Sequence, residues 1–328
     1  MSKLKRKKKI IFKFVTIALV IIFFLSGILI FVDLWERKNG KFPEQKVSET
    51  VKIFNGREYV PKENIETFLV IGLDKYKDEI NNDSYNNDQK ADFLMLFVYD
   101  DSKKECKVLN INRDTMAKMN TLDIAGNKLH TVTKQIALAH TYGKGEEISA
   151  NNTVNAVSEL LLGESIDHYV SITMDSVVKY NDYVGGVEVE VLDDFTGVDE
   201  TLIKGQKILL KGEHALNYVR TREGLEDSSN STRMKRQQQY VKALYNKLKE
   251  RVEEDENFIL NAPFEKSDFT SDRNDNQLKE LADKLSEYEL IEIDGIEGET
   301  KMGEKYLEVY PNADSIEKTV IELFYQPK

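Results

Sequence analysis

A stretch of nineteen uncharged residues near the start of the chain does most to limit what it can fold into. Residues 14–32 read FVTIALVIIFFLSGILIFV. At about 1.5 Å rise per residue, a helix of this length is about 28 Å long, which matches the hydrocarbon core of a bilayer. Residues 1–13 carry seven Lys and Arg side chains and no acidic one, and such segments stay on the cytoplasmic side. The pattern predicts a transmembrane helix over 14–32, a cytoplasmic N-terminus and an exported remainder.

The alternative to a membrane anchor is a cleaved signal peptide. Its apolar region would be shorter, and a cleavage site of the small-x-small type would follow it. The segment ends instead in FVDLW at 31–35, where Trp35 is placed as an interfacial aromatic anchor. We therefore expect a single-pass protein of the cell membrane whose large domain is extracellular.

The distribution of charge argues against a nucleic-acid partner. The chain of 328 residues has a net charge of −11, and because its first thirteen residues are basic, the remainder carries −18. A domain this acidic repels phosphate groups over most of its surface. Cys106 is the only cysteine, so no intrachain disulfide forms, which suits a Gram-positive surface better than a disulfide-rich ectodomain.

Mixed strand and helix patterns predict a single α/β domain over residues 65–328. Residues 33–64 are polar and predict a stalk. Apolar β-branched runs predict strands, and apolar residues spaced three or four apart predict helices. The expected strands are 68–72, 93–99, 107–112 and 187–191, and the expected helices are 134–142, 152–162, 176–183, 212–219, 232–251, 276–288 and 315–324. We expect a mixed sheet flanked by helices, with 252–328 completing the same domain.

Three charged residues stand at the ends of the first three predicted strands. Asp74 directly follows the first strand, Asp92 directly precedes the second, and Arg113 closes the third. If these strands pair antiparallel, as the short connection between the second and third favours, their three ends meet at one edge of the sheet. Two carboxylates with room for water suit Mg²⁺, which prefers oxygen ligands. Taken singly, each aspartate is better explained by a turn or by the start of a strand, so the metal site depends on convergence.

The segment RTREGLEDSSNSTRMKRQQQ, residues 220–239, concentrates arginine and glutamine in this acidic domain. Arg220 and Arg222 point the same way if their segment is extended, and Arg233 and Gln237 share one face of a helix. Guanidinium groups bind phosphate oxygens through two parallel hydrogen bonds. Beside a metal site and next to a membrane, such a cluster predicts a di- or polyphosphate ligand. The alternative is a surface of salt bridges to the acidic residues of the same segment.

Six short motifs follow one another in a specific order. They are LVIGLD (69–74), KADFLML (90–96), NINRDT (110–115), VVKYNDYVGGVEVEV (177–191), LKGEHALNYVRTR (210–222) and RMKRQQQ (233–239). With this order and spacing, the chain resembles the LytR-CpsA-Psr family of membrane-anchored bacterial cell-wall ligases. The resemblance implies the family's sandwich of sheet and helices, and the attachment of an anionic glycopolymer, carried on polyprenyl pyrophosphate, to peptidoglycan.

The resemblance also implies site residues. Asp74 and Asp92 match the aspartates associated with Mg²⁺, for which Mn²⁺ is the alternative cation. The positions matching the pyrophosphate-binding set are Lys90, Arg113, Arg220, Arg222, Arg233 and Gln237. Asp92, Arg113 and Arg220 are implied as catalytic. At Lys90 the chain departs from the family, which has an arginine there, and so loses a guanidinium fork.

Some positions of the family pattern are matched less directly. Asn230 stands where the family has an acidic residue, and a further family lysine matches either Lys128 or Lys134. The family's lipid lies in a hydrophobic tunnel between sheet and helices, for which the helices at 134–142 and 152–162 are the expected walls.

The function expected from the residues and the resemblance together is a Mg²⁺-dependent phosphotransferase. Its partners would be a polyprenyl-pyrophosphate-linked glycopolymer, a peptidoglycan acceptor and the membrane. Two alternatives stand beside it. One is a polyprenyl-pyrophosphate hydrolase, in which water replaces the acceptor hydroxyl. The other is a non-catalytic protein that binds lipid-linked glycans or regulates the envelope.

Overall fold

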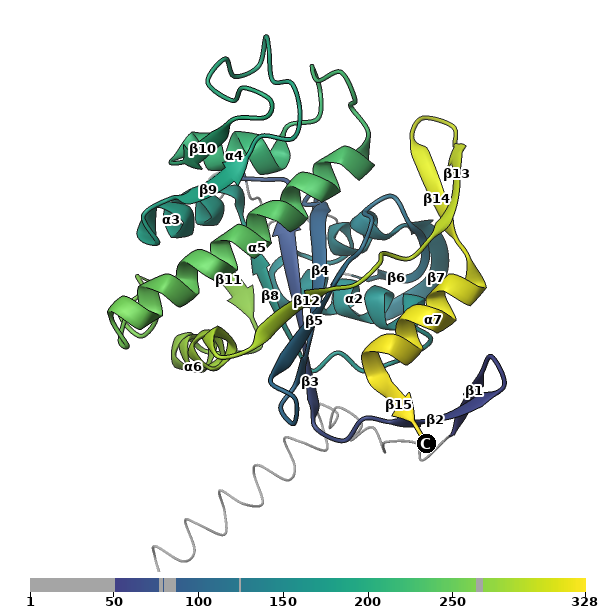
Figure 1. Cartoon of the computed structure of the whole chain (residues 1–328). Coiled ribbons are helices and arrows are strands. Elements are labelled where there is room, and N and C mark those ends of the chain that lie inside the picture. Colours follow the sequence, from purple (N-terminus) through teal and green to yellow (C-terminus); the bar gives the residue numbers. More distant parts are fainter. Residues whose placement is uncertain (1–50, 77–78, 80–86, 124, 264–267) are drawn as a thin grey trace, which may run out of the picture. The chain divides into compact units, whose positions relative to one another are not determined.

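The computed structural model describes residues 51–76, 79, 87–123, 125–263 and 268–328 (Figure 1). The basic segment 1–13 and the predicted transmembrane segment 14–32 lie outside the described residues. Among the helices that are described, including the 25-residue α5 (Asn230–Glu254), none has the apolar length that crossing a bilayer requires.

A six-stranded mixed sheet lies at the centre of the domain, in the order β11-β8-β3-β4-β5-β12. The strands are β3 (Ile65–Leu73), β4 (Ala91–Asp100), β5 (Glu105–Asn110), β8 (His168–Ile172), β11 (Phe269–Ser271) and β12 (Glu289–Glu292). The neighbours β3, β4 and β5 pair antiparallel, as the sequence predicts. Because β11 and β12 come from residues 252–328 and pair with β8 and β5, this part of the chain completes the same sheet.

One face of the sheet is covered by a solid apolar layer. Its elements are β6 (Met116–Leu122), β7 (Lys128–Gln135), the 3-10 helix η2 (Ile136–Thr141), α2 (Glu146–Leu160) and α7 (Ala313–Phe324). Alternate strand residues such as Leu69, Ile71 and Leu96 are fully buried against this layer, as the two-residue period of a strand requires. Ala150 and Ala156 of α2 are buried in the same cluster, so this helix packs against the sheet through small side chains.

The helix predicted over 134–142 is present only over residues 136–141, as the 3-10 helix η2. Lys134 and Gln135 end β7, and the six residues of η2 follow. The backbone N–H of Ile136 donates to the carbonyl of Thr115 (2.8 Å), and that of Ala137 donates to the carbonyl of Arg113 (3.1 Å). Pairing with this distant segment keeps Lys134 and Gln135 in the strand, so the helix starts two residues later than the apolar spacing predicts.

The opposite face of the sheet is covered by α5 and α6 (Asp275–Ser286). The strand residues on this face include large aromatic side chains such as Phe68, Phe97 and Tyr99, and they enclose an apolar cavity of about 240 Å³ with Leu281 and Leu285 of α6. The predicted tunnel walls, the segments 134–142 and 152–162, belong to the layer on the other face and do not line this cavity.

A separate apolar cluster holds the segments that carry the arginines. It joins α3 (Met174–Tyr183), β9 (Val187–Glu190), β10 (Lys207–Leu210) and α4 (Glu213–Arg220) to α5. The buried Arg236 on α5 donates hydrogen bonds to the carbonyls of Tyr218 and Thr221. Its Nε lies 2.7 Å from Asp193 Oδ2, close but not aligned as a hydrogen bond. Arg236 thus fixes the position of α4 relative to α5.

Part of the segment predicted as stalk is folded. The strands β1 (Lys52–Phe54) and β2 (Arg57–Pro61) form a hairpin, and β2 also pairs with the last strand of the chain, β15 (Tyr325–Pro327). Residues 52–61 are therefore part of the domain, and the predicted boundary at residue 65 is too late. The signal was present in the sequence: Asn55-Gly56 have φ of 49° and 73°, the conformation of a type I′ hairpin turn, which favours these two residue types.

A two-stranded hairpin of β13 (Gly298–Met302) and β14 (Leu307–Pro311) stands beside β6 and β7 (Figure 1). The N–H of Val309 donates to the carbonyl of Asp114 (2.9 Å), and Val309 forms a parallel bridge with Thr115. The hairpin is thereby attached to the loop that leaves β5, directly after Arg113.

A buried histidine predicts how stability depends on pH. His140 is 1% exposed, its Nδ1 lies 3.2 Å from the carbonyl of Gln89, and its Nε2 has no hydrogen-bond partner. Burial lowers its pKa to about 4 from an ordinary value of 6.5. Between these two values the unfolded chain binds the proton more readily than the folded one, so stability falls as pH falls. We expect a loss of about 2 kcal/mol between pH 7 and pH 5 from this group.

The measurement is chemical unfolding of the full chain at pH 7, 6 and 5. His140→Gln, which keeps a donor for the Gln89 carbonyl, should flatten this pH dependence. His130→Gln, at an exposed position of β7, is the matched control and should leave it unchanged. Equal slopes for the chain and for both variants would contradict the prediction.

Candidate active site

The ends of β3 and β4 hold Asp74 close to the start of β4. The N–H of Asp74 donates to the carbonyl of Lys90 (3.1 Å), and the N–H of Lys90 donates to Asp74 Oδ1 (2.8 Å). Burial raises the pKa of the Asp74 carboxyl, and the nearby negative charge of Asp92 raises it further. The Lys90 and Arg113 charges oppose this shift. The predicted convergence of Asp74, Asp92 and Arg113 at one edge of the sheet is therefore present.

Asp92 lies at the centre of the site, between two guanidinium groups. Arg113 Nη1 donates to Asp92 Oδ1, and Arg233 Nη1 donates to Asp92 Oδ2 (3.0 Å). Arg113 comes from the end of β5, and Arg233 comes from the first turns of α5, 120 positions further along the chain. One carboxylate therefore fixes two arginines from distant segments, and holds them at the same sheet edge.

A buried amide network supports Arg233. Asn230 Oδ1 accepts hydrogen bonds from Arg233 Nε (3.1 Å) and Nη2 (2.6 Å), and Asn230 Nδ2 donates to Asn112 Oδ1 (2.7 Å). Arg233 is 4% exposed, and burial lowers its pKa against the opposing effect of the Asp92 charge. Because Asn230 is neutral, it holds Arg233 in place without cancelling the positive charge of the guanidinium group.

Arg113 and Arg222 retain unused donor capacity. The Nε of Arg113 is buried without a hydrogen-bond partner, 3.5 Å from Asp114 Oδ1. Arg222 is half-buried and makes no ion pair within the described part of the chain, yet its charge lowers the pKa of both Asp114 and Arg233. Positive groups close enough to perturb one another, with donors left over, provide an environment for an anion.

Arg220 lies at the end of α4, exposed, with its guanidinium carbon 5.8 Å from the centre of the Tyr76 ring. The alternative of a salt-bridged surface is not what the structure shows. Of the acidic residues in 220–239, none pairs with an arginine among the residues described, and Asp227 instead accepts the N–H of Ser229 (2.9 Å). The cations of this segment are thus not neutralised by their neighbours in sequence.

Gln237 and the candidate lysines are placed differently from the arginines. Gln237 is buried, and its Nε2 donates to the carbonyl of Val219 (3.2 Å), so its amide holds α4 on α5. Lys128 begins β7 in an exposed position, and Lys134 Nζ lies 5.9 Å from the centre of the Tyr142 ring. Neither lysine pairs with Asp74 or Asp92 within the described ranges.

Sequence reasoning missed Gln135. Its Nε2 donates to Asp114 Oδ1 (3.1 Å) and to the carbonyl of Leu307 (2.8 Å), so it joins the site loop to the hairpin β13–β14. Burial raises the pKa of Asp114, with the charges of the site arginines opposing. No local pattern identifies this contact, because it joins three segments that are far apart in sequence.

Asp74 and Asp92 suit a divalent cation that brings other ligands with it. Within the described residues, no three His, Cys, Asp or Glu side chains are grouped to hold a metal ion. Mg²⁺ is commonly held by one or two carboxylates together with waters and substrate phosphates. Asp74 Oδ1 and both oxygens of Asp92 accept hydrogen bonds. Asp92 also lies near enough for its negative charge to raise the pKa of Asp74. Two carboxylates that repel each other in this way fit a cation whose remaining ligands are phosphate oxygens.

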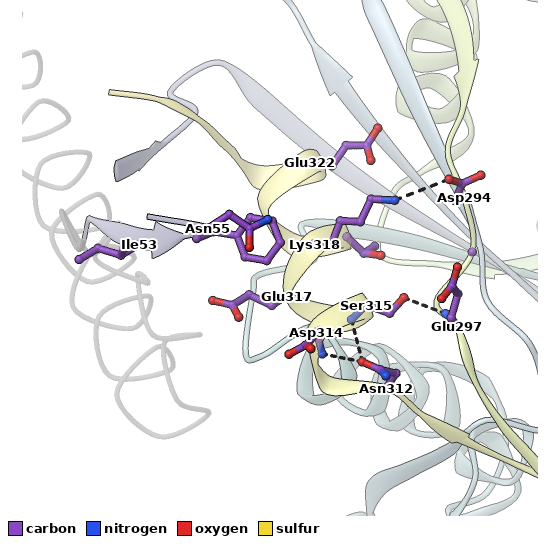
Figure 2. Close-up of a pocket in the computed structure, with 13 residues that line it drawn as sticks. Ile53, Asn55, Asp294, Glu297, Asn312, Asp314, Ser315, Glu317, Lys318 and Glu322 are labelled. Atoms are coloured by element: carbon purple, nitrogen blue, oxygen red, sulfur yellow. Dashed lines mark hydrogen bonds and ion pairs between the residues drawn. The ribbon is translucent and has the colours of Figure 1, made fainter. Parts of the chain in front are cut away.

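A wider depression of about 470 Å³ lies elsewhere, between α7, β1 and residues 294–297 (Figure 2). Its lining is acidic, with Asp294, Glu317 and Glu322, and Lys318 lies 3.7 Å from Asp294. None of the predicted site residues lines it. Because negative walls repel phosphate, this depression is not the candidate site despite its size.

Comparisons with known proteins give named relatives. Polyisoprenyl-teichoic acid–peptidoglycan teichoic acid transferase TagV of Bacillus subtilis is 32% identical over 165 residues, 48% of this chain and 39% of the relative. TagU of Halalkalibacterium halodurans is 30% identical over 179 residues, 54% and 51% of the two chains. TagU of Enterococcus faecalis is 29% identical over 254 residues, 76% and 73%. The chain thus spans about half or less of the length of the first two relatives.

Solved structures share the fold. B. subtilis TagV has a TM-score of 0.59 at 23% identity, over 80% of this chain and 97% of that chain. The structure of TagT bound to LIIa-WTA has a TM-score of 0.61 at 21% identity, over 86% and 96%. A family model, that of the LytR_cpsA_psr family, matches residues 35–320. With this match over most of its length, the chain belongs to the LytR-CpsA-Psr family.

Proposed function

We propose that the protein is a membrane-anchored phosphotransferase that moves an anionic glycopolymer from a polyprenyl-pyrophosphate carrier to peptidoglycan. One observation carries this proposal: Asp92 holds Arg113 and Arg233 at one end of β3 and β4, and other residues of the same two strands line an apolar cavity. The arginines could bind a charged headgroup, and the cavity could bind a hydrocarbon chain. The names of relatives TagU and TagV support the reaction class.

The arginines would bind the two phosphates. Arg113 and Arg233 are already oriented by Asp92, and Arg222 and Arg220 lie on the neighbouring segment without ion-pair partners among the residues described. Groups fixed in advance stabilise developing charge without reorganising during the reaction. The apolar cavity on the α6 side would take the part of the isoprenoid nearest to the phosphates, because its walls are almost entirely apolar.

The reaction is a transfer between two oxygens on phosphorus. An acceptor sugar hydroxyl oxygen bonds to the phosphorus attached to the glycopolymer, and the bond from that phosphorus to the oxygen of polyprenyl phosphate breaks. The hydroxyl proton leaves to solvent or to a carboxylate, and polyprenyl phosphate departs with the bonding electrons. Negative charge builds on the phosphate oxygens, where Arg113 and Arg233 would stabilise it. A divalent cation at Asp74 and Asp92 supplies further positive charge when bound.

The proposed location is the cell membrane, with the N-terminus cytoplasmic and the catalytic domain outside. The predicted segment 14–32 supports this, because its length and its basic flank fit an anchored helix. A site that handles a lipid carrier also benefits from being held close to the bilayer.

The test is transfer by the full chain in phospholipid vesicles, with polyprenyl-pyrophosphate-linked glycopolymer and purified peptidoglycan. We expect covalent attachment to peptidoglycan in the presence of Mg²⁺ and a fall of at least about tenfold after chelation, because a metal typically supplies several kcal/mol of charge stabilisation. Mn²⁺ should restore transfer. Carrier phosphate released equally fast without peptidoglycan would favour the hydrolase, and binding without turnover would favour the non-catalytic protein.

A further inference from the structure

The hairpin β13–β14 exposes apolar and aromatic side chains. Met302 is 71% exposed, Tyr306 is 68% exposed and Tyr310 is 41% exposed. All five residues of β13 are exposed, and within β14 only Val309 is buried. Single exposed apolar side chains are normal on a protein surface, but several gathered on one hairpin are of the kind that marks a contact site.

The two tyrosines stand in the strand and in the turn of the hairpin. Tyr310 lies in β14 on the same side as Glu308, two residues earlier, and Tyr306 lies in the turn that precedes β14. The Oη of Tyr310 donates to Glu308 Oε2 (2.6 Å), and Lys301 Nζ lies 5.2 Å from the centre of the Tyr310 ring. The ring is therefore held in place by its neighbours, with carboxylate and ammonium groups around it.

The hairpin is attached directly to the candidate active site. Its backbone is bonded to Asp114, the residue after Arg113, through the N–H of Val309 (2.9 Å). Gln135 Nε2 joins Asp114 Oδ1 to the carbonyl of Leu307. A molecule lying on the hairpin is thus held next to the arginine that contacts Asp92.

The hairpin and the apolar cavity lie on different faces of the central sheet. The cavity is lined by the strand face that α6 covers. By contrast, β14 is bonded to Asp114 and Thr115, which lead into β6, and to Gln135 at the end of β7, and β6 and η2, which follows β7, pack in the layer on the other face. In phosphoryl transfer the attacking and leaving oxygens are roughly in line across the phosphorus. If the leaving carrier occupies the cavity side, the attacking hydroxyl approaches from the hairpin side.

We propose that the outer face of β13–β14 is the docking surface for the acceptor, a neutral glycan strand of peptidoglycan. This inference rests on the proposed function, since it names where the second substrate lies. Flat aromatic rings offer large contact area at a low entropy cost, and they suit the apolar faces of sugar rings, while Glu308 and Lys301 provide hydrogen bonds for hydroxyls. The three glutamates and two lysines of 298–311 argue against an anionic lipid surface as the occupant, because acidic groups are repelled there.

The experiment compares the full chain with Tyr306→Ser/Tyr310→Ser in sedimentation with sacculi stripped of attached glycopolymer, and in the vesicle transfer assay. We expect the KM for sacculi to rise about tenfold, the effect of losing two aromatic contacts, with the rate at saturating acceptor kept. Tyr306→Phe/Tyr310→Phe keeps the rings and should bind as the unchanged chain does. Ile53→Ser is the matched control, since Ile53 is 68% exposed on the other hairpin, β1–β2.

Three results would overturn the docking surface. The first is unchanged sedimentation and KM in the serine variant. The second is a lower rate at saturating acceptor with KM unchanged, which would mean that the hairpin acts through Asp114 instead. The third is a change of oligomeric state in size-exclusion chromatography, which would assign this face to a second copy of the chain.

The failure of the docking surface can be told apart from failure of the proposed function. If the unchanged chain transfers glycopolymer and the serine variant transfers equally well, the docking surface is wrong and the function stands. If the unchanged chain transfers nothing but sediments with sacculi in a tyrosine-dependent way, the docking surface stands and the transferase is wrong.

Discussion

Arg113→Ala lowers the rate of glycopolymer transfer on the order of 10²–10³-fold, about 3–4 kcal/mol in the barrier, if the site works as proposed. The substitution removes a guanidinium that Asp92 holds at the sheet edge and whose Nε has no other hydrogen-bond partner. Charge that builds on the phosphate oxygens then loses one fixed donor group. The vesicle transfer assay measures the change as kcat, because the lost interaction belongs to the transition state.

Two further variants make this result specific. Arg113→Lys keeps the positive charge but loses the planar fork, so we expect an intermediate rate. Arg57→Ala is the matched control, since Arg57 is exposed on β2, which belongs to a different sheet from β3, β4 and β5. A KM effect on the carrier with kcat unchanged would show that Arg113 only binds the ground state. An unaltered rate in Arg113→Ala would contradict the proposed role altogether.

Arg236→Leu destabilises the folded domain by about 3–5 kcal/mol. The guanidinium is fully buried, donates to the carbonyls of Tyr218 and Thr221, and lies 2.7 Å from Asp193. Removing it leaves two carbonyls and one carboxylate without their partner in the region that joins α4 to α5. Unfolding by urea, followed by circular dichroism of the detergent-solubilised full chain, measures the loss.

The matched control is Arg251→Leu, which lies on the same helix. Its guanidinium pairs with Glu254 in an exposed setting, with side-chain exposures of 37% and 62%, and exposed ion pairs contribute less than about 1 kcal/mol. Equal destabilisation by the two variants would show that burial is not the cause. Since Arg236 positions the segment that carries Arg220, the Arg236 variant should also lower transfer at temperatures where it remains folded.

The candidate site is positively charged, whereas the surrounding domain is acidic. Its acidic bulk and the acidic depression beside α7 repel anionic polymer from most of the surface. Arg113, Arg222 and Arg233 remain as a local exception, close enough for their charges to interact. An anionic polymer is thus repelled by most of the surface and attracted only near these arginines, and specificity comes from both effects. Screening by salt should therefore weaken carrier binding.

The core strands could be predicted from the sequence, because each of them is a short run of apolar residues that indicates a buried strand. The runs at 68–72, 93–99 and 107–112 are found within β3, β4 and near β5, and the antiparallel pairing needed to bring Asp74, Asp92 and Arg113 together is present. The placement of Arg233 and Gln237 on one helix could be predicted for a similar reason, since a helix repeats every 3.6 residues. By contrast, the apolar spacing over 134–142 predicts one helix, whereas pairing with Thr115 keeps Lys134 and Gln135 in β7 and leaves only 136–141 helical.

By itself the sequence determined the fold class, the strand ends that carry the acids, and the residue types suited to a phosphate ligand, because these depend on short-range periodicity and side-chain chemistry. Only the tertiary structure decided which side-chain donors remain available for a ligand. Gln237 donates to a backbone carbonyl of α4, and Arg236 donates to two backbone carbonyls. Arg222 has no ion-pair partner among the described residues. It also decided which face holds the apolar cavity and that Gln135 joins the site to β14. These contacts join residues from different elements, from Gln237 and Val219, 18 positions apart, to Gln135 and Leu307, 172 positions apart. Which elements meet depends on the packing of the whole domain, which no local pattern contains.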